Sequence, residues 1–396
     1  MKFTDLGLDP RILEGIDAMG YENATPVQQQ VMVPILEGKD IIAAAQTGTG
    51  KTAAFLLPLL HRLLTSPHHA GDINAMIIVP TRELAIQIAE SIEGLSYFTD
   101  VSSIAVYGGG DGNSFVTEKK ALTSGVDIVV CTPGRMIAHL NMGYVKLKGL
   151  KYLVLDEADR MLDMGFSDDL SKIVTFLPAV RQNLLFSATM PAKMRVLAKK
   201  LLNNPIEINI AISKPPEQIV QKAFILYEAQ KVPIIIDMLS SKKFSKVIVF
   251  CSKKLNVKQL TVKLKSAKLA VAEIHSDLDQ KSREQYLQDF RNQKINILVA
   301  TDVLSRGIDI DDIDLVINYD VPNDGEDYIH RIGRTARAAT SGTAFTLVGE
   351  SEQGKCAIIE QLLGEPIFKG TVPAEFGPTP AYNPKAVVKK GFNRRR

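Results

Sequence analysis

One stretch of the sequence combines glycine, lysine and hydroxyl side chains in a pattern suited to binding phosphate. Residues 45–52 read AQTGTGKT, after a short apolar run and before the helix-like AAFLLPLLHRLL. Such glycines let the backbone curl so that successive N–H groups and a helix N-terminus converge on phosphate oxygens. The lysine adds a positive charge, and the final threonine hydroxyl can bind magnesium. The stretch therefore predicts a phosphate-binding loop, although Ala45 stands where the first glycine is usual; its binding residues are Thr47, Gly48, Thr49, Gly50, Lys51 and Thr52.

A pair of carboxylates could complete such a site. Asp156 and Glu157 follow the apolar run YLVL, 156 − 51 = 105 residues after Lys51. Magnesium keeps most of its waters and is held by one or two carboxylates together with phosphate. We expect Asp156 to bind the metal with Thr52, and Glu157 to act as general base on the attacking water. Alternatively, both acids complement the dipole of a following helix.

Two arginines in the second half suit charge stabilisation during phosphoryl transfer. The segment HRIGRTARA covers residues 330–338 and places Arg334 and Arg337 three apart, on one face of a helical turn. An arginine supplied from outside the phosphate-binding domain accelerates phosphoryl transfer by roughly 10³ to 10⁵. Alternatively, the segment is a solvated basic face with surface ion pairs.

Short apolar runs alternate with helix-like segments, which predicts parallel sheets with helical crossovers and so an α/β fold. Because open parallel sheets bind ligands at the carboxyl ends of their strands, the polar clusters that follow these runs should share one edge of each sheet. In the first half we expect strands at 40–45, 75–79, 103–107, 127–131, 152–155 and 183–186, and in the second half at 247–250, 270–274, 295–300, 315–318 and 343–348.

Two domains follow from this pattern and from the break between its halves. Pro215 and Pro216 forbid helix and favour an extended connection. Beyond about residue 370 the periodicity gives way to proline, glycine and basic residues. We expect a first domain at 1–210, a linker at 211–219, a second domain at 220–370 and a flexible basic tail at 371–396.

Length and composition exclude several classes of protein. A chain of 396 residues with 45% hydrophobic and 23% charged residues is neither fibrous nor wholly disordered. The N-terminus lacks an apolar export segment and no long uncharged apolar run occurs, which predicts a cytoplasmic protein without membrane insertion. Its three cysteines are widely spaced in apolar runs and indicate buried thiols.

The net charge of +3 comes from the C-terminus. Residues 383–396 hold six Lys or Arg and no acid, which leaves 41 − 44 = −3 for residues 1–382. Such a terminus suggests contact with a polyanion, or it is a solvated extension.

The ordered motifs resemble one family, the DEAD-box RNA helicases of helicase superfamily 2. The resemblance covers residues 1 to about 370 and rests on GYENATPVQ with Phe3 upstream, AQTGTGKT, PTRELA, YGGG, TPGR, DEAD, SAT, VIVFCSKK, QKSR, TDVLSRGID and HRIGRTARA. It implies two RecA-like domains in tandem, which bind ATP with Mg²⁺ between them and RNA across them. The chain departs from the family pattern at Ala24, Ser276 and Ala336, the last of which replaces a glycine between the two arginines.

The resemblance also assigns roles to residues. Gln28 would read adenine with Phe3 or Tyr21 packing near the base, Asp309 would hold the ribose, and Arg334 and Arg337 would be arginine fingers, with His330 beside them in the catalytic motif. Asp159, Ser187 and Thr189 would link the nucleotide site to the interdomain surface. The residues that match backbone-contacting positions for RNA are Thr81, Arg82, Gly109, Thr132 and Arg135 in the first domain and Arg283 and Thr301 in the second. Contacts of this kind recognise phosphates and 2′-hydroxyls without reading bases.

The same motifs are compatible with two functions. The first is an RNA-dependent ATPase that separates short duplexes by local strand distortion. The second is an ATP-gated RNA clamp that grips RNA without unwinding it. A DNA helicase is disfavoured, because the DEAD and GYENATPVQ motifs resemble RNA enzymes, and a small-molecule kinase would leave the second domain unexplained.

Overall fold

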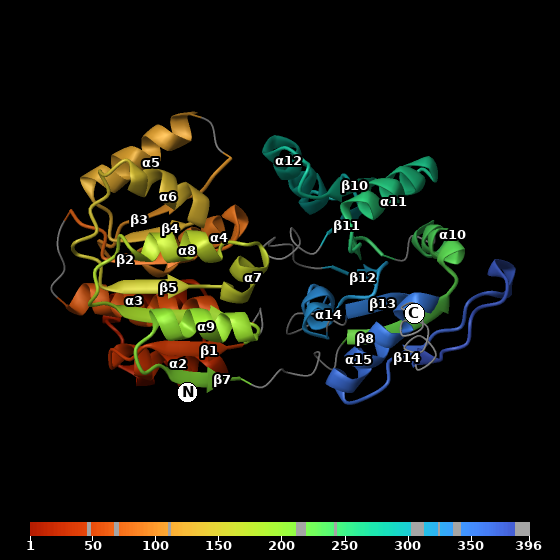
Figure 1. The fold of residues 1–396 in the computed structure, drawn as a ribbon, viewed down its shortest axis with the longest axis horizontal. Helices are drawn as coiled ribbons and strands as arrows, with labels where there is room; N and C mark the ends of the chain where they lie inside the picture. Colours follow the sequence, from red (N-terminus) through yellow and green to blue (C-terminus); the bar gives the residue numbers. More distant parts are fainter. Residues whose placement is uncertain are drawn as a thin grey trace, which may run out of the picture. The chain divides into compact units, whose positions relative to one another are not determined.

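The computed structural model describes residues 1–45, 49–66, 71–109, 112–210, 219–240, 244–301, 313–323, 325–335 and 342–384. The chain divides into two compact units, Met1–Ile212 and Ser213–Arg396 (Figure 1). Each unit is built around its own sheet. We call them the first and the second unit.

The described part of the first unit contains a seven-stranded, entirely parallel sheet with the order β3-β4-β2-β5-β6-β1-β7. All six strands expected from the sequence are present. The seventh, at an edge, was not expected, because its short alternating segment IEIN follows a turn and carries little apolar signal. The strands are β1 (Ile41–Ala44), β2 (Ala75–Ile78), β3 (Ser103–Val106), β4 (Ile128–Cys131), β5 (Tyr152–Leu155), β6 (Gln182–Ser187) and β7 (Ile206–Asn209).

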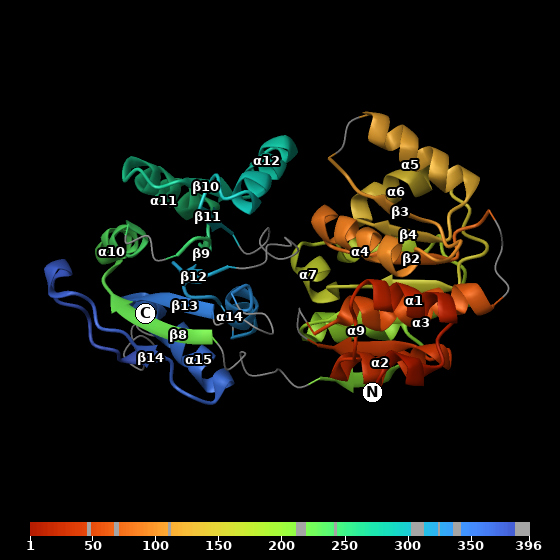
Figure 2. The ribbon, with the colours of Figure 1, turned by 180° about the vertical axis from the view of Figure 1, so that it is seen from behind.

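Helices cover both faces of this sheet because successive strand residues point to opposite sides. Ile77 and Val154 pack with helices α1 to α4, which lie in front in Figure 2. Their neighbours Ile78 and Leu155 pack with α5 to α9, of which α6, α8 and α9 lie in front in Figure 1. The helices are α1 (Pro10–Ala18), α2 (Pro26–Leu36), α3 (Lys51–Thr65), α4 (Arg82–Leu95), α5 (Gly112–Ser124), α6 (Pro133–Asn141), α7 (Ala158–Asp163), α8 (Ser167–Val174) and α9 (Ala192–Leu201), with a 3-10 turn η1 at Phe3–Leu6.

The second unit repeats the architecture. In its described residues a seven-stranded parallel sheet has the order β10-β11-β9-β12-β13-β8-β14. The five expected strands are present, and the additional β8 and β14 lie side by side at one edge. The strands are β8 (Ile219–Leu226), β9 (Val247–Phe250), β10 (Val271–Ile274), β11 (Ile297–Ala300), β12 (Leu315–Asn318), β13 (Gly342–Gly349) and β14 (Phe368–Lys369).

Its helices also form two layers. Val249 and Ile317 pack with α10 and α11 on one face, whereas Ile248 and Val316 pack with α12 on the other. Helices α14 and α15 cover that second face beside β8 and β13. The bounds are α10 (Glu228–Ser240), α11 (Lys254–Ser266), α12 (Gln280–Arg291), α14 (Gly325–Ile332) and α15 (Gln353–Leu363), with 3-10 turns η2 (Glu350–Glu352) and η3 (Ala374–Phe376). The predicted α/β class with parallel sheets is confirmed in both units.

The segment after β14 corrects one expectation. The sequence predicted a flexible tail from Thr371, which is wrong for residues 371–384. Gln230 Nε2 donates to the carbonyl oxygens of Phe376 and Pro378 over 2.7 and 3.0 Å. The Phe376 side chain packs on the core between the sheet and α10. Val372 packs against the same core. These two apolar side chains therefore hold the segment in place, although its proline- and glycine-rich composition predicted flexibility.

The same segment continues to α15. Asn383 N donates to Gln353 Oε1 over 2.6 Å, and the Tyr382 hydroxyl donates to Glu360 Oε2 over 2.6 Å. We call residues 371–384 the strap; Pro384 is the last residue that the structure describes. The six cations of the predicted tail follow it and lie outside the described residues.

The three cysteines agree with the expectation of buried thiols. Cys131, Cys251 and Cys356 are buried free thiols. Among the described residues, no helix is long and apolar enough to cross a membrane, and no cluster of three or more His, Cys, Asp or Glu side chains could hold a metal ion.

Candidate nucleotide and RNA site

The parallel register brings the predicted polar clusters of the first unit to one edge of its sheet. Ala45, Asp156 and Ser187 lie at or just beyond the ends of β1, β5 and β6, which are neighbours with β5 and β1 on either side of β6. Thr81 and Thr132 follow β2 and β4 at the same edge. Residues separated by up to 142 positions, 187 − 45, are therefore gathered at one edge.

The phosphate-binding loop ends on the first turn of α3. Gly50 adopts φ 88°, and a side chain there would meet Gln28 Nε2 at 2.6 Å, so that only glycine fits. The helix begins without a side-chain cap, unlike α2 and α4, which both have a threonine cap. Its first N–H groups are thus suited to an anionic ligand. Lys51 is buried, and its ammonium donates to Ala45 O over 2.7 Å.

Gln28 is placed against this loop. It is buried, with 4% of its surface exposed, and its Nε2 donates to Gly50 O over 3.1 Å. Its Oε1 accepts from Thr25 N over 2.8 Å in a capping box that starts α2. The side chain predicted to read adenine therefore fixes the distance between the start of α2 and the last glycine of the phosphate-binding loop.

Asp156 has the electrostatic character expected of a cation ligand. It is 3% exposed, and burial raises its pKa to about 6, against the opposing effect of the nearby Lys51 charge. The hydrogen bond from Glu157 N to Asp156 Oδ1, 2.9 Å long, only partly compensates the buried charge. A divalent cation would supply the missing compensation, so Asp156 fits a magnesium ligand. Thr52, the second ligand predicted from the sequence, lies on the first turn of α3.

Glu157 is held in an unusual backbone conformation. Its φ of 49° lies in the left-handed region, which non-glycine residues seldom occupy and which is common at functional sites. Its Oε2 accepts from Arg160 Nη1 over 2.9 Å, and both residues are buried. Sequence reasoning did not find Arg160, although its position three residues after Glu157 on a helix was a usable signal.

The three residues predicted to link the site to the rest of the molecule contact each other. Asp159 Oδ2 accepts from Thr189 N over 2.9 Å. The Ser187 hydroxyl donates to Thr189 O over 2.7 Å. The loop after β6 is thereby tied to the first turn of α7, which follows the two acidic residues directly.

Of the five predicted RNA-contacting residues of the first unit, Thr81, Arg82 and Gly109 lie close together. Thr81 caps α4, and the guanidinium of Arg82 lies over the Tyr107 ring at 5.0 Å. Gly109 has φ 87°, and a side chain there would meet Arg82 Nη1 at 2.5 Å. Thr132 precedes α6, and its N–H donates to Val106 O over 3.0 Å. The fifth, Arg135, lies on the first turn of α6.

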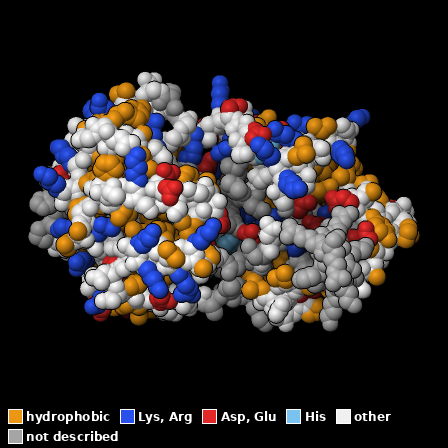
Figure 3. All heavy atoms as spheres, viewed as in Figure 1, with side chains coloured by type: hydrophobic (Ala, Val, Ile, Leu, Met, Phe, Trp, Pro, Cys, Tyr) orange, Lys and Arg blue, Asp and Glu red, His pale blue; other side chains and the backbone are white. Residues whose placement is uncertain are grey.

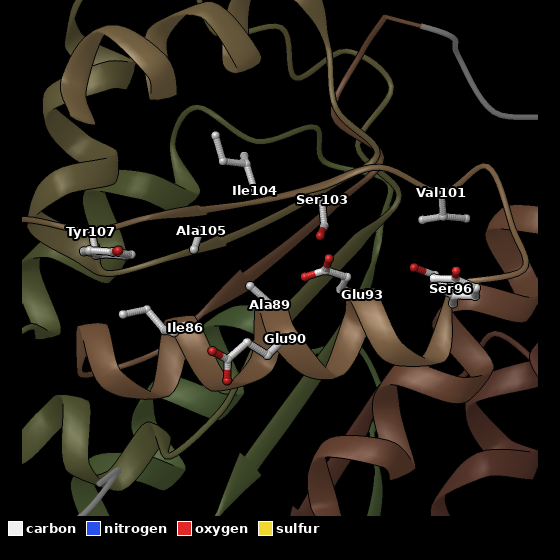
Figure 4. A pocket seen from close by; sticks show the side chains of 11 residues that line it. Ile86, Ala89, Glu90, Glu93, Ser96, Val101, Ser103, Ile104, Ala105 and Tyr107 are labelled. Carbon is white, nitrogen blue, oxygen red and sulfur yellow. The ribbon is translucent and has the colours of Figure 1, made fainter. Parts of the chain in front are cut away.

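An open groove lies near these residues but contains none of the predicted site residues. It runs between α4 and the edge strand β3, and Figure 4 shows the Glu93 carboxylate pointing toward Ser103 across it. Glu90 and Glu93 make its lining acidic, which disfavours phosphate. On the face shown in Figure 3, the Lys and Arg side chains of the first unit are distributed over the surface among other side chains, and some lie next to one another.

In the second unit, α14 carries the predicted catalytic histidine, and Arg334 follows it in a turn. His330 and Arg334 are both half-buried. The buried Arg331 between them anchors the helix to β12, because its Nη1 donates to Asn318 Oδ1 over 3.1 Å and to Asp320 O over 2.8 Å. Sequence reasoning missed this anchor, since it considered only arginines at the spacing suited to phosphate.

The remaining predicted residues lie in several places. Thr301 follows β11 and its N–H donates to Ile274 O over 3.2 Å, while Arg283 lies on the first turn of α12. Phe3 is buried in the first unit's core, whereas Tyr21 is 39% exposed. Four predicted site residues lie outside the described residues, namely Thr47, Gly48, Asp309 and Arg337.

Comparisons with known proteins agree with this geometry. The DEAD/DEAH box helicase family matches residues 25–197, and the helicase conserved C-terminal domain matches residues 230–339. The chain is 42% identical over 361 residues to the ATP-dependent RNA helicase CshA of Listeria monocytogenes, covering 91% of this chain and 68% of the relative. It is 38% identical to the ATP-dependent RNA helicase eIF4A of Scheffersomyces stipitis, covering 95% and 93%.

Solved structures show the same fold. The structure of S. cerevisiae Dbp5 bound to RNA and ADP BeF3 is similar with a TM-score of 0.83 and 31% identity, over 94% of this chain and 96% of that chain. The structure of Mss116p bound to ssRNA and AMP-PNP gives a TM-score of 0.81 and 30% identity, over 94% and 80%. The motifs, the two parallel sheets and these relatives lead to one conclusion: the chain belongs to the DEAD-box family of ATP-dependent RNA helicases, with two RecA-like domains in tandem.

Proposed function

We propose that this helicase hydrolyses ATP on the carboxyl edge of its first sheet and uses the cycle to separate or remodel short RNA duplexes. The observation that supports this most directly is the convergence of Gln28, Lys51 and Asp156 on the loop before α3. Gln28 contacts Gly50, and the charge of Lys51 acts on Asp156. In this proposal the second unit acts on the bound nucleotide when RNA and ATP are both bound.

Each residue has a defined part in this proposal. Lys51 and the N–H groups of α3 hold the phosphates, and Gln28 selects adenine. Thr52 and Asp156 would hold magnesium, which when bound would neutralise phosphate charge as a Lewis acid. Glu157 accepts the proton of the attacking water. Arg334 and Arg337 of the second unit compensate the charge that develops on the transferred group, and Asp309 holds the ribose.

RNA recognition is proposed to be independent of base sequence. Thr81, Thr132 and the glycine turn at Gly109 offer hydroxyl and backbone groups, and arginines offer charge, which suit phosphates and 2′-hydroxyls. Arg283 and Thr301 would extend the RNA-contacting surface on the second unit.

The three buried free thiols suit a reducing compartment, and we propose that the protein is cytoplasmic.

A strand-displacement assay tests the proposal. A short RNA duplex with one labelled strand is incubated with the full chain and ATP, and Lys51→Ala is the negative control. Displacement that requires ATP and fails with the same duplex made of DNA is the expected result. ATP-dependent retention of RNA without displacement would instead favour an RNA clamp.

A further inference from the structure

Helices α5 and α6 are joined by a buried polar cluster that no nucleotide contact explains. We call Phe115, Glu118, Arg135, His139 and Tyr144 the Glu118 cluster. Phe115 and Glu118 lie on α5, Arg135 and His139 lie one turn apart on α6, and Tyr144 follows α6. The two helices lie side by side in Figures 1 and 2. Helix α5 follows the predicted RNA-contacting motif YGGG, and α6 begins within the motif TPGR.

A single carboxylate oxygen lies at the centre of the cluster. Glu118 Oε2 accepts from Arg135 Nε over 2.6 Å and from His139 Nε2 over 2.8 Å. The Glu118 side chain is 6% exposed and His139 is fully buried. Burial raises the pKa of Glu118, but the hydrogen bonds from His139 and Arg135 outweigh burial, so the pKa is lowered overall. Glu118 is thus a buried anion that depends on both partners.

Histidine and phenylalanine fix the orientation of this carboxylate. The two ring nitrogens of His139 both have a hydrogen-bond partner: Nε2 contacts Glu118 Oε2 and Nδ1 contacts the Tyr144 hydroxyl. The Phe115 ring stacks on His139 with centroids 4.4 Å apart and planes inclined by 13°. The Arg135 guanidinium carbon lies 4.6 Å from the centroid of that same ring. Arg135 is therefore held from two sides.

These contacts leave part of the guanidinium for another acceptor. Only Nε of Arg135 is bound to Glu118, and Nη2 is buried without a hydrogen-bond partner among the described residues. Leaving such a donor unpaired is unfavourable, so a small shift that brings Nη2 to an acceptor is favoured. The Arg135 side chain is 15% exposed, so it lies at the surface where an acceptor can approach. The Arg135 guanidinium is held at Nε by Glu118 and on its flat face by Phe115. Its two terminal nitrogens therefore point in a fixed direction, which suits bidentate binding of a phosphate.

We propose that Glu118 is a positioning residue for RNA binding, which orients Arg135 toward the RNA backbone, and that His139 and Phe115 hold Glu118 and Arg135 in that arrangement. The inference rests on the proposed role of Arg135 in contacting RNA. It adds that α5 does more than pack on the sheet, because Glu118 on α5 sets the direction of the Arg135 guanidinium on the first turn of α6.

The test measures RNA dependence and turnover separately in the full chain. ATPase rates are recorded against the concentration of a single-stranded RNA for the wild type and for Glu118→Gln, which keeps the side-chain shape and removes its charge. Loss of one charge-assisted hydrogen bond should raise the RNA concentration for half-maximal stimulation about tenfold. The turnover at saturating RNA and the KM for ATP should stay near wild type.

Three further variants separate positioning from a general loss of stability. Asp40→Asn removes another buried carboxylate, which accepts from Asn183 N and Asn203 N over 2.8 Å each at the opposite end of the strands. It should lower the free energy of unfolding without changing the RNA requirement. His139→Gln retains a donor toward Glu118 and should keep the RNA requirement closer to wild type than His139→Leu does.

A double-mutant cycle decides whether Glu118 acts through Arg135. Arg135→Ala should raise the RNA requirement, and adding Glu118→Gln to it should cause no further change. An additive double mutant, or a normal RNA requirement in Glu118→Gln, overturns the positioning role while leaving the helicase function intact. A wild-type ATPase that RNA does not stimulate overturns both the positioning role and the proposed function.

Discussion

Arg160 Nη1 donates to Glu157 Oε2 over 2.9 Å, and this ion pair joins the proposed general base to the first turn of its own helix. The side chains are 4% and 12% exposed. The pair limits the rotamers of Glu157, whose backbone already lies in the left-handed region. The catalytic carboxylate is therefore positioned by its helix as well as by the sheet.

Glu157→Gln should bind ATP and RNA but hydrolyse ATP slowly. The amide keeps the shape of the side chain but cannot accept a proton, and loss of a general base lowers kcat by about 10² to 10⁴. A complex of protein, RNA and ATP should accumulate, which RNA retention on a filter measures. Glu93→Gln, an exposed carboxylate change on α4, is the control, and turnover near wild type in Glu157→Gln would remove the assignment.

The raised pKa of Asp156 predicts competition between protons and magnesium. The folded protein holds a proton on Asp156 below about pH 6, well above the ordinary carboxyl value of 3.8. Since the cation needs the ionised carboxylate, each pH unit below this value should raise the magnesium requirement of the ATPase about tenfold. Magnesium titrations on both sides of that pH measure the effect. A magnesium requirement that does not change with pH contradicts Asp156 as the ligand.

Gln28→Ala should weaken ATP binding and reduce the preference for ATP over GTP. The change removes the hydrogen bonds to Gly50 O and from Thr25 N, so it also loosens the end of the phosphate-binding loop. Gln29→Ala is a neighbouring control, because its Nε2 donates to Ala24 O and not to the loop. Competition with GTP in the ATPase assay gives the selectivity. Equal use of ATP and GTP by the wild type would exclude the adenine role.

Much of this arrangement could be predicted from the sequence because its signals are local. A glycine-rich loop before a helix and an acidic pair after an apolar run each indicate chemistry without knowledge of distant residues. The parallel register then follows from alternation of strands and helices. Eleven expected strands occur near their predicted bounds. Three strands were missed: the short edge strands β7 and β14, and β8 between β13 and β14, whose apolar run is interrupted by Gln221 and Lys222.

The rest depends on contacts between distant segments. Glu118 meets His139 only because α5 and α6 pack side by side, and neither residue belongs to a recognisable motif. The strap at 371–384 is held by two glutamines that lie far from it in the sequence. Gln230 bonds to Phe376, 146 residues later, and Gln353 bonds to Asn383, 30 residues later. Composition alone could not show these anchors.

Because the strap is packed on the second unit, the effect of the basic C-terminus on RNA binding can be tested separately from its effect on stability. Deleting residues 385–396 removes all six cations and leaves Tyr382 and Asn383 in place. RNA affinity should fall and its dependence on salt should flatten, because fewer counterions are released on binding. Unfolding by urea should be unchanged. Deleting 371–396 should additionally destabilise the second unit by removing Phe376 from its core.

Binding isotherms for RNA at several salt concentrations distinguish the two roles of the C-terminus. An unchanged slope of log affinity against log salt after removal of 385–396 would mean that the cations are a solvated extension. Saturated ATP turnover should stay near wild type in this shorter deletion, because the site residues on both sheets are retained.

The prediction for Arg337 depends on cooperation between the two units, because an arginine of the second unit is proposed to act on the nucleotide bound by the first. It lies outside the described residues, three positions after Arg334, which follows a helix that Arg331 anchors to β12. Arg337→Ala should keep ATP binding and basal RNA association but lose RNA-stimulated hydrolysis by about 10³, because the transition-state charge is uncompensated. Arg337→Lys should restore little, since an ammonium cannot reproduce the planar guanidinium.

A cation elsewhere on the second unit provides the control for Arg337. Lys294 is 68% exposed and pairs with Asp289 over 3.3 Å, so Lys294→Ala should change stability by less than about 1 kcal/mol and leave turnover unchanged. If Arg337 were a surface arginine of the same kind, its alanine variant would behave like Lys294→Ala. ATPase rates against RNA concentration for the three variants separate these outcomes. Normal stimulation in Arg337→Ala would mean that the first unit hydrolyses ATP without an arginine from the second.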